Sequence, residues 1–273
     1  MVVITSLDDP RIAPYRSLRE ISSRNVEEKL FVVENSKVIR RLLTSKCEIR
    51  SFFATRHYHE EFAALLDAKG LAWEHRLTAD DTLMSAIVGY TLHEGVMALA
   101  VVPHVPYFSE HLPTLELPAV CLCGVADAEN VGSIVRNCAA FGVHSLVVDS
   151  ATCSPYLRRA VRVSLGGIFA LTVYRISNLT SALEEMRHSR PSVQHIALET
   201  SAQARSLHTV SFSQESIFIF GSEAHGLSVD ILSACDLVVE IPMTPLADYD
   251  AANSLNVAAS TAIALYHWQN GRK

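Results

Sequence analysis

Three separated stretches of the chain carry polar residues at spacings suited to binding an anion or a nucleotide. The first begins at Gly124 and contains Asn130, Gly132 and Arg136. Asn130 and Gly132 open a predicted helix, whose exposed N–H groups attract anions. Arg136 lies close to two turns further on, so we expect it to share a face with Asn130. An arginine there is more often a phosphate clamp than a core residue, because burying it unpaired is costly.

The second stretch follows an apolar run that ends at Phe220, and it contains Gly221, Glu223 and Gly226. Two glycines around a strand end allow a ligand to approach the backbone closely. The spacing matches neither the dinucleotide-binding fingerprint nor the P-loop. Taken alone, this stretch is better explained as an ordinary strand-to-helix turn.

The third stretch lies near the C-terminus, where Ile241-Pro242-Met243 precedes a loop and then Ser254 and Asn256. The residues that follow predict a helix capped by Asn253 or Ser254. Its recurring face is small and apolar, which would let another backbone approach closely. That face consists of Leu255, Ala258, Ala259, Ala262, Ile263 and Tyr266. A packed terminal helix is the simpler explanation, but the polar residues at its start keep a functional site open.

The elements that would position these stretches alternate between apolar runs and helical patterns after residue 118. Near-continuous apolar strands separated by helices predict a largely parallel sheet covered on both faces. Ligands of such sheets bind beyond the carboxyl ends of the strands, where the three stretches begin. The predicted strands are 119–123, 145–148, 169–174, 195–198, 217–220 and 237–241, and the predicted helices are 131–141, 155–162, 179–187 and 228–233.

The opening part of the chain predicts a smaller α/β unit, with strands at 30–33, 49–54 and 95–102 and helices at 10–24, 36–43 and 59–69. Prolines are frequent after it, at 103, 106, 113 and 118. This segment is therefore predicted to be an interdomain linker. The predicted organisation is an N-terminal domain at 1–102, a linker at 103–118 and a C-terminal domain at 119–273.

The composition, 49% hydrophobic and 19% charged, is that of a globular protein. No apolar run reaches transmembrane length and the first residues lack a basic signal region, so we expect a cytoplasmic protein with no membrane partner. The six cysteines form no CxxC pair, which predicts reduced thiols. The histidines are scattered, and we expect no metal.

The net charge of −6 argues against indiscriminate coating of nucleic acid, which depends on neutralising phosphates. The charge is nevertheless uneven. Between residues 151 and 176 the chain carries Arg158, Arg159, Arg162 and Arg175 and no acidic residue. This basic zone fits contact with a defined nucleic acid. A solvated basic surface explains it equally well.

Together and in this order, the three stretches resemble the motifs of the SpoU/TrmH class of SPOUT RNA methyltransferases. The class is marked by N-x-G-x-x-x-R-x-x-x-x-F-G, G-x-E-x-x-G-L and I-P-M … S-L-N-V motifs. The matching residues are Asn130, Gly132, Arg136, Phe141 and Gly142, then Gly221, Glu223, Gly226 and Leu227, then Ile241 to Met243 and Ser254 to Val257. The resemblance covers residues from about 118 to 270. The opening domain is similar, less specifically, to the substrate-binding domain that often precedes the catalytic domain in this class.

The resemblance implies methyl transfer from S-adenosylmethionine to a ribose 2′-hydroxyl of RNA, ribosomal more than transfer RNA. It also implies a homodimer and a parallel sheet with a C-terminal trefoil knot, preceded by a small α/β RNA-binding domain. By the family pattern, the cofactor is held by backbone groups at Thr200, Gly221, Ile241 and Leu255.

The catalytic residues that the resemblance implies are Arg136, Asn130, Ser254, Asn256 and Glu223. Arg136 would contact phosphate and assist deprotonation; because the pKa of a free arginine lies above about 12, we favour phosphate positioning over a role as the base. Asn130, Ser254 and Asn256 would orient the substrate and the helix ends, and Glu223 would support the loops. Arg158, Arg159 and Arg162 are the candidate RNA-backbone contacts.

One departure from the family pattern lies in the loop at 244–253, which is longer than usual and lacks the expected glycine. Two other hypotheses stay open. One is a catalytically silent RNA-binding protein on the same fold, against which the intact polar residues speak. The other is a metabolic α/β enzyme with a nucleotide cofactor, which lacks a dinucleotide or P-loop fingerprint.

Overall fold

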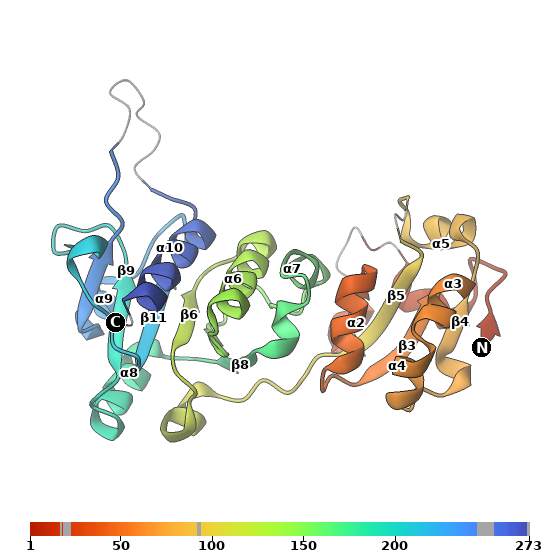
Figure 1. Ribbon diagram of the computed structural model, residues 1–273, viewed down its shortest axis with the longest axis horizontal. Helices are drawn as coiled ribbons and strands as arrows, with labels where there is room; N and C mark the ends of the chain where they lie inside the picture. The colour runs from red at the N-terminus through yellow and green to blue at the C-terminus, as the bar shows by residue number, and fades with distance from the viewer. Residues whose placement is uncertain (17, 19–22, 92–93, 245–253, 272–273) are drawn as a thin grey trace. The chain divides into compact units, whose positions relative to one another are not determined.

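The computed structural model describes residues 1–16, 18, 23–91, 94–244 and 254–271 (Figure 1). The chain forms two compact units, one of Met1–His104 with Tyr156–Phe169 and the other of Val105–Pro155 with Ala170–Lys273. Residues 156–169 therefore pack with the first unit, although sequence position alone placed them in the C-terminal domain. The ring of Tyr156 lies 5.6 Å from that of Phe31, which gives this segment an apolar anchor in the first unit.

The second unit is built on a sheet of seven strands in the order β10-β12-β9-β11-β6-β7-β8. Every pairing in it is parallel, so the predicted parallel α/β fold is confirmed. Strand order alone does not establish the predicted trefoil knot, which stays a prediction. The strands are β6 (Ala119–Cys123), β7 (Ser145–Val148), β8 (Thr172–Arg175), β9 (Gln194–Leu198), β10 (Arg205–Ser206), β11 (Ser216–Gly221) and β12 (Leu237–Glu240).

Side chains on both faces of this sheet are buried, as its apolar strands predict. Along β11, Ile217 and Ile219 join the core formed with η3, α8 and α9. Phe218 points to the opposite face, where its ring lies 6.4 Å from that of Trp268 in α10. The helices of this unit are η3 (Phe108–Thr114), α6 (Ala128–Phe141), α8 (Leu179–Ser189), η5 (Leu207–Thr209), α9 (Val229–Ala234) and α10 (Val257–Asn270).

The C-terminal helix α10 buries a different face from the predicted one. Its buried residues are Val257, Ala258, Thr261, Ala264, Leu265 and Trp268. Of the predicted face, Leu255 precedes the helix, and Ile263 and Tyr266 are 38% and 60% exposed. The helix is apolar nearly all round, so periodicity could not choose between its faces. Burial of the large Trp268 indole, whose N–H donates to the Ser213 carbonyl at 3.0 Å, fixes the orientation.

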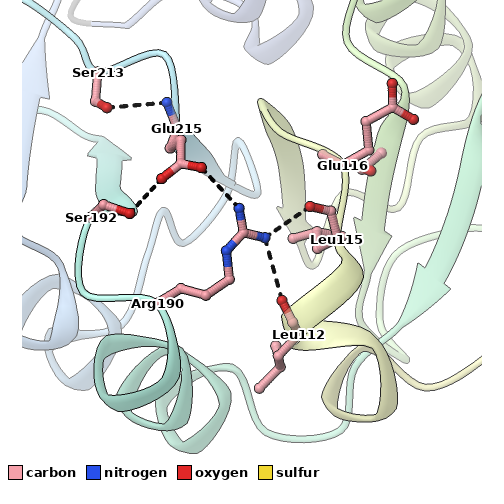
Figure 2. Close-up of polar contacts among 8 residues, drawn as sticks. Leu112, Leu115, Glu116, Arg190, Ser192, Ser213 and Glu215 are labelled. Carbon is pink, nitrogen blue, oxygen red and sulfur yellow. Dashed lines mark hydrogen bonds and ion pairs between the residues drawn. The ribbon is translucent and has the colours of Figure 1, made fainter.

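Most of the segment predicted as a linker, residues 105–118, is an ordered part of the second unit. Phe108, Leu112 and Leu115 are 1%, 1% and 3% exposed and belong to the core of that unit. Arg190 binds the end of η3, and Figure 2 shows its guanidinium between two backbone carbonyls and a carboxylate. It donates to the carbonyls of Leu112 at 3.4 Å and Leu115 at 2.9 Å, and to Glu215 at 3.2 Å. The prolines thus shape a packed turn here and do not mark a free tether.

Replacing Arg190 is expected to destabilise the second unit. Arg190→Ala leaves the Leu112 and Leu115 carbonyls without their donor, which we expect to cost about 1–3 kcal/mol of the free energy of unfolding. Urea unfolding of the whole chain measures the loss. The control is Glu215→Ala, which removes only the more exposed partner of the ion pair and should cost less. Equal losses in the two variants would contradict the dominance of the carbonyl contacts.

The first unit is a small α/β domain with a five-stranded sheet in the order β1-β4-β3-β5-β2. Strands β1, β4 and β3 are parallel, whereas β5 is antiparallel to both of its neighbours. The strands are β1 (Val2–Val3), β2 (Leu30–Glu34), β3 (Ile49–Ala54), β4 (Arg76–Thr78) and β5 (Val96–Val101). The helices are η1 (Pro10–Tyr15), α1 (Ser23–Glu27), α2 (Ser36–Thr44), α3 (Arg56–Glu61), α4 (Ala63–Ala68), η2 (Trp73–His75), α5 (Asp81–Val88) and α7 (Arg158–Val163), followed by η4 (Gly167–Ala170).

Several predicted boundaries were wrong for local reasons. The single helix at 10–24 is instead the short η1 and α1, because Pro14 interrupts the helical hydrogen bonds; residues 17 and 19–22 lie outside the described part. The helix at 59–69 divides at Phe62 into α3 and α4. The strand at 169–174 starts only at Thr172, after a 3-10 turn. The short strands β1, β4 and β10 and helix α5 carried no pattern strong enough to be predicted.

Candidate active site

The three predicted stretches meet at the side chain of Asn130, in the first turn of α6. The Asn256 amide donates to Asn130 Oδ1 at 2.8 Å, and the Asn130 amide donates to the Glu223 carboxylate. Because a carboxylate only accepts, this pair fixes which way the Asn130 amide points. One side chain thus ties together the loops after β6 and β11 and the start of α10.

Helix capping explains why these loops hold their shape. Asp127 caps α6 by accepting from the N–H groups of Glu129 at 2.7 Å and Asn130 at 3.0 Å. Asn256 caps α10 in the same way, through the Ala258 N–H at 2.9 Å. The predicted cap of the C-terminal helix, Asn253 or Ser254, was therefore three or two residues too early. Since each cap satisfies backbone donors, the polar residues at both helix starts have a local structural role.

A pocket opens at the carboxyl ends of β9, β11 and β12, beside the start of α10. All four predicted cofactor-binding residues line it, namely Thr200, Gly221, Ile241 and Leu255. Two of the predicted catalytic residues, Glu223 and Ser254, line it as well. Asn130 is joined to the pocket by its hydrogen bond to Glu223, and Asn256 is joined to Asn130. The position of the pocket is the one expected for a ligand of a parallel sheet.

Glycine is required where the walls of this pocket meet. A Cβ on Gly221 would lie 2.4 Å from the carbonyl carbon and 2.5 Å from the carbonyl oxygen of Gly226. Gly226 itself has a φ of +62°, and a Cβ there would lie 2.4 Å from the Glu199 carboxylate. The loop after β11 thus folds back on its own strand with no room for side chains.

Glu199 is a pocket residue that sequence reasoning missed. Its carboxylate accepts from the Leu227 N–H at 2.8 Å and from the Thr200 N–H at 3.1 Å. It therefore joins the loop after β9 to the loop after β11. The only sequence signal was its place directly after a buried strand, where side chains of a parallel sheet reach the ligand edge.

Arg136 lies apart from this network. It is exposed on α6, is absent from the pocket lining, and has no hydrogen-bond or ion-pair partner among the residues that the structure describes. Six residues of helix turn about 600°, which leaves Arg136 about 120° around the axis from Asn130. The expected shared face was wrong; Asn137 is the residue that faces α10, where it donates to the Ala258 carbonyl at 2.8 Å. The catalytic role of Arg136 stays a prediction.

The thiol beside the start of α6 is not a nucleophile. The Cys153 N–H donates to the Val125 carbonyl at 3.0 Å, in the loop that leads to α6. Burial, and then the nearby charge of Asp127, raise the pKa of Cys153 to about 11. The side chain is therefore a neutral thiol at pH 7, and nucleophilic cysteine chemistry has no thiolate here.

The arginines predicted to contact RNA lie on α7, in the first unit. Arg158 donates to Glu34 at 2.8 Å and to the Tyr90 hydroxyl at 2.9 Å, and Arg162 donates to Glu34 at 3.3 Å. Burial and the adjacent Glu34 carboxylate raise the pKa of Tyr90. Arg158 thus has a clear structural role. Exposed Arg159 and half-exposed Arg162 stay predicted RNA contacts.

Loss of Arg158 is expected to destabilise the first unit. The Arg158 and Glu34 side chains are 22% and 10% exposed, so Arg158→Ala removes the nearer guanidinium donor from a buried carboxylate. We expect a loss of about 1–3 kcal/mol in the free energy of unfolding, measured by urea denaturation. Arg162→Ala is the matched variant and should cost less, because that side chain is 49% exposed. A larger loss for Arg162 would contradict this ranking.

The family follows from the comparisons with known proteins. Residues 118–266 match the SpoU rRNA Methylase family, which is more than half of the 273 residues. The chain belongs to this family. The span of the match contains all three motif stretches and the pocket between them.

The similarity to known relatives extends beyond the residues that match the SpoU family. An uncharacterized tRNA/rRNA methyltransferase of Mycobacterium bovis is 31% identical over 265 residues, which are 95% of this chain and 88% of that protein. The 23S rRNA (guanosine-2′-O-)-methyltransferase RlmB of Nitrosomonas europaea is 26% identical and covers 84% of this chain and 86% of its own length.

Solved structures share the fold of the whole SpoU chain. The AdoMet-bound rRNA methyltransferase of Sinorhizobium meliloti superposes with a TM-score of 0.80 at 23% identity, over 99% of this chain and 98% of that one. The SpoU methyltransferase AviRb of Streptomyces viridochromogenes, in complex with AdoMet, gives 0.79 at 21% identity, over 97% and 99%.

Two further findings concern the part of the SpoU chain that the structure describes. None of its helices combines the length and hydrophobicity that a membrane span requires. Nor do these residues include a group of three or more His, Cys, Asp or Glu side chains placed to hold a metal ion. The unusual loop at 244–253 lies almost wholly outside the described residues, because 245–253 are not among them.

Proposed function

We propose that this protein is a cytoplasmic RNA methyltransferase that uses S-adenosylmethionine to methylate a ribose 2′-hydroxyl, in ribosomal more than in transfer RNA. The observation that carries the proposal is the meeting of the three motif stretches at Asn130, beside one pocket at the carboxyl end of the sheet. The named 2′-O-methyltransferase relative supports the ribose specificity, and it also favours ribosomal RNA.

The pocket suits the cofactor in its chemistry. Gly221 and Gly226 contribute backbone groups to its walls, and half-buried Ile241 offers an apolar surface. Such a mixture of apolar surface and a few polar groups is typical of nucleotide-sized ligands. Bound there, S-adenosylmethionine would supply an electrophilic methyl group. The AdoMet-bound structures of the same fold support this choice of cofactor.

The residues of this chain would place and activate the hydroxyl. A 2′-hydroxyl is a poor nucleophile, so reaction needs close placement and removal of its proton. Asn130 and Asn256 hold the loop ends, and Ser254 lies at the pocket wall, where it can orient a ribose. Glu223, already bonded to Asn130, supports the loops. Exposed Arg136 has its five donors available to an RNA phosphate.

The first unit, which contains the domain predicted at 1–102, would bind the RNA. Arg159 and Arg162 of this unit would contact the RNA backbone. A second copy of the chain would cover the apolar surface of α10. Ile263 and Tyr266 are exposed there, and the Phe141 ring of α6 lies 6.5 Å from the Tyr266 ring. Apolar patches of this kind mark interfaces. Sedimentation equilibrium would give the mass of the proposed homodimer.

The decisive experiment maps 2′-O-methylation across cellular RNA in cells with and without this protein. A nucleotide that loses its methyl group in the deletion strain, and regains it with the purified protein and S-adenosylmethionine, supports the proposal and identifies the substrate. An unchanged map together with RNA binding would favour the catalytically silent RNA-binding protein instead.

A further inference from the structure

The lining of the pocket is acidic. It includes Glu199, Glu223 and Glu240, and among the described residues that line it there is no lysine, arginine or histidine. A cleft lined by one sign of charge focuses its field on whatever binds inside. A ligand of this pocket is therefore selected by charge as well as by shape.

The three carboxylates differ in how far their charge is compensated. Glu199 accepts two backbone N–H bonds and Glu223 accepts one from the Asn130 amide. Glu240, half-buried at the end of β12, has no hydrogen-bond or ion-pair partner among the described residues. A half-buried carboxylate without a donor attracts a cation more strongly than one already bonded. Of the three carboxylates, Glu240 is therefore the one that no donor from the described residues stabilises.

We propose that Glu240, aided by Glu199, makes the pocket discriminate between the methyl donor and its demethylated product; this rests on the proposed function. Transfer to a hydroxyl forms an O–CH3 bond and breaks the S–CH3 bond, whose electron pair stays on sulfur, while the hydroxyl proton passes to solvent. S-adenosylhomocysteine therefore has one positive charge fewer than S-adenosylmethionine. The carboxylates favour the charged donor and weaken the hold on the neutral sulfide, which assists product release.

The test compares dissociation constants by titration calorimetry, with S-adenosylmethionine and S-adenosylhomocysteine as the two probes. Wild-type protein should bind the donor more tightly than the product, and this preference should shrink as salt is raised. Glu240→Gln keeps the shape and removes the charge. It should lower the ratio of the product's dissociation constant to the donor's by about threefold to tenfold. This is the size of one charge interaction at a partly exposed site. Glu185→Gln, exposed on α8 and outside the pocket, should leave the ratio unchanged.

Other outcomes would overturn the inference. If Glu240→Gln raises the dissociation constants of both ligands by the same factor, the carboxylate contacts a group that both ligands share, such as a ribose hydroxyl. If the ratio changes in neither Glu240→Gln nor Glu199→Gln, and salt does not affect it in the wild type, charge plays no part. If wild-type protein binds neither ligand, the proposed cofactor itself is wrong, which is a separate failure.

Discussion

Arg136→Ala is expected to abolish RNA methylation while leaving the affinity for S-adenosylmethionine unchanged. Arg136 is outside the pocket lining, so the cofactor site should survive its loss. If its guanidinium anchors the RNA phosphate, the ribose loses its placement, and we expect a fall in turnover of about 100-fold or more. Single-turnover methylation of the mapped RNA, beside calorimetric titration of the cofactor, measures both effects.

Two matched variants sharpen this test. Arg136→Lys keeps the charge but loses the planar fork, so it should recover only part of the activity. Arg205→Ala removes an exposed arginine of β10 that also lies outside the pocket, and activity should persist. Turnover within a few-fold of wild type in Arg136→Ala would refute the catalytic assignment.

Gly221→Ala is expected to lower the affinity for the cofactor strongly. The added methyl carbon would lie 2.4 Å from the Gly226 carbonyl carbon and 2.8 Å from the Leu227 nitrogen, both in the backbone. The loop must move to make room, and overpacking of this kind costs about 1–3 kcal/mol. Since the same loop forms a pocket wall, affinity for S-adenosylmethionine should fall by at least about tenfold, or about 1.4 kcal/mol.

A second glycine separates loss of the pocket from loss of stability. Gly142 has a φ of +73° and its added Cβ would meet nothing within 4 Å. Gly142→Ala should therefore cost about 1–2 kcal/mol of stability through backbone strain alone. Its cofactor affinity should equal that of wild type. Equal loss of affinity in the two variants would show that general destabilisation, and not the pocket wall, is responsible.

The fold and the members of the site were predictable where local chemistry decides them. Apolar strands such as Ile217–Phe220 must be buried on both faces, which gives the parallel sheet. The glycines at Gly221 and Gly226 are needed by the backbone itself, and motif order then placed the polar residues at one edge.

What sequence could not supply depends on packing between distant segments. Nothing local distinguishes the two apolar faces of α10, and contacts with distant residues such as Phe218 and Ser213 select the one that carries Trp268. Glu199 gained its role from the Leu227 N–H, which lies far along the chain. The proline pattern of the predicted linker does not distinguish a loose segment from a packed one, such as this segment, which Arg190 binds.

The first unit is not one continuous segment of the chain. Because Tyr156–Phe169 completes it, a fragment that ends at His104 would leave Glu34 without its guanidinium partners and Phe31 without Tyr156. Exchange of this unit between relatives must therefore move two segments together. We expect that recombination at one crossover yields poorly folded chimaeras here, so that changes in the proposed RNA-binding role of this unit arise by substitution within it.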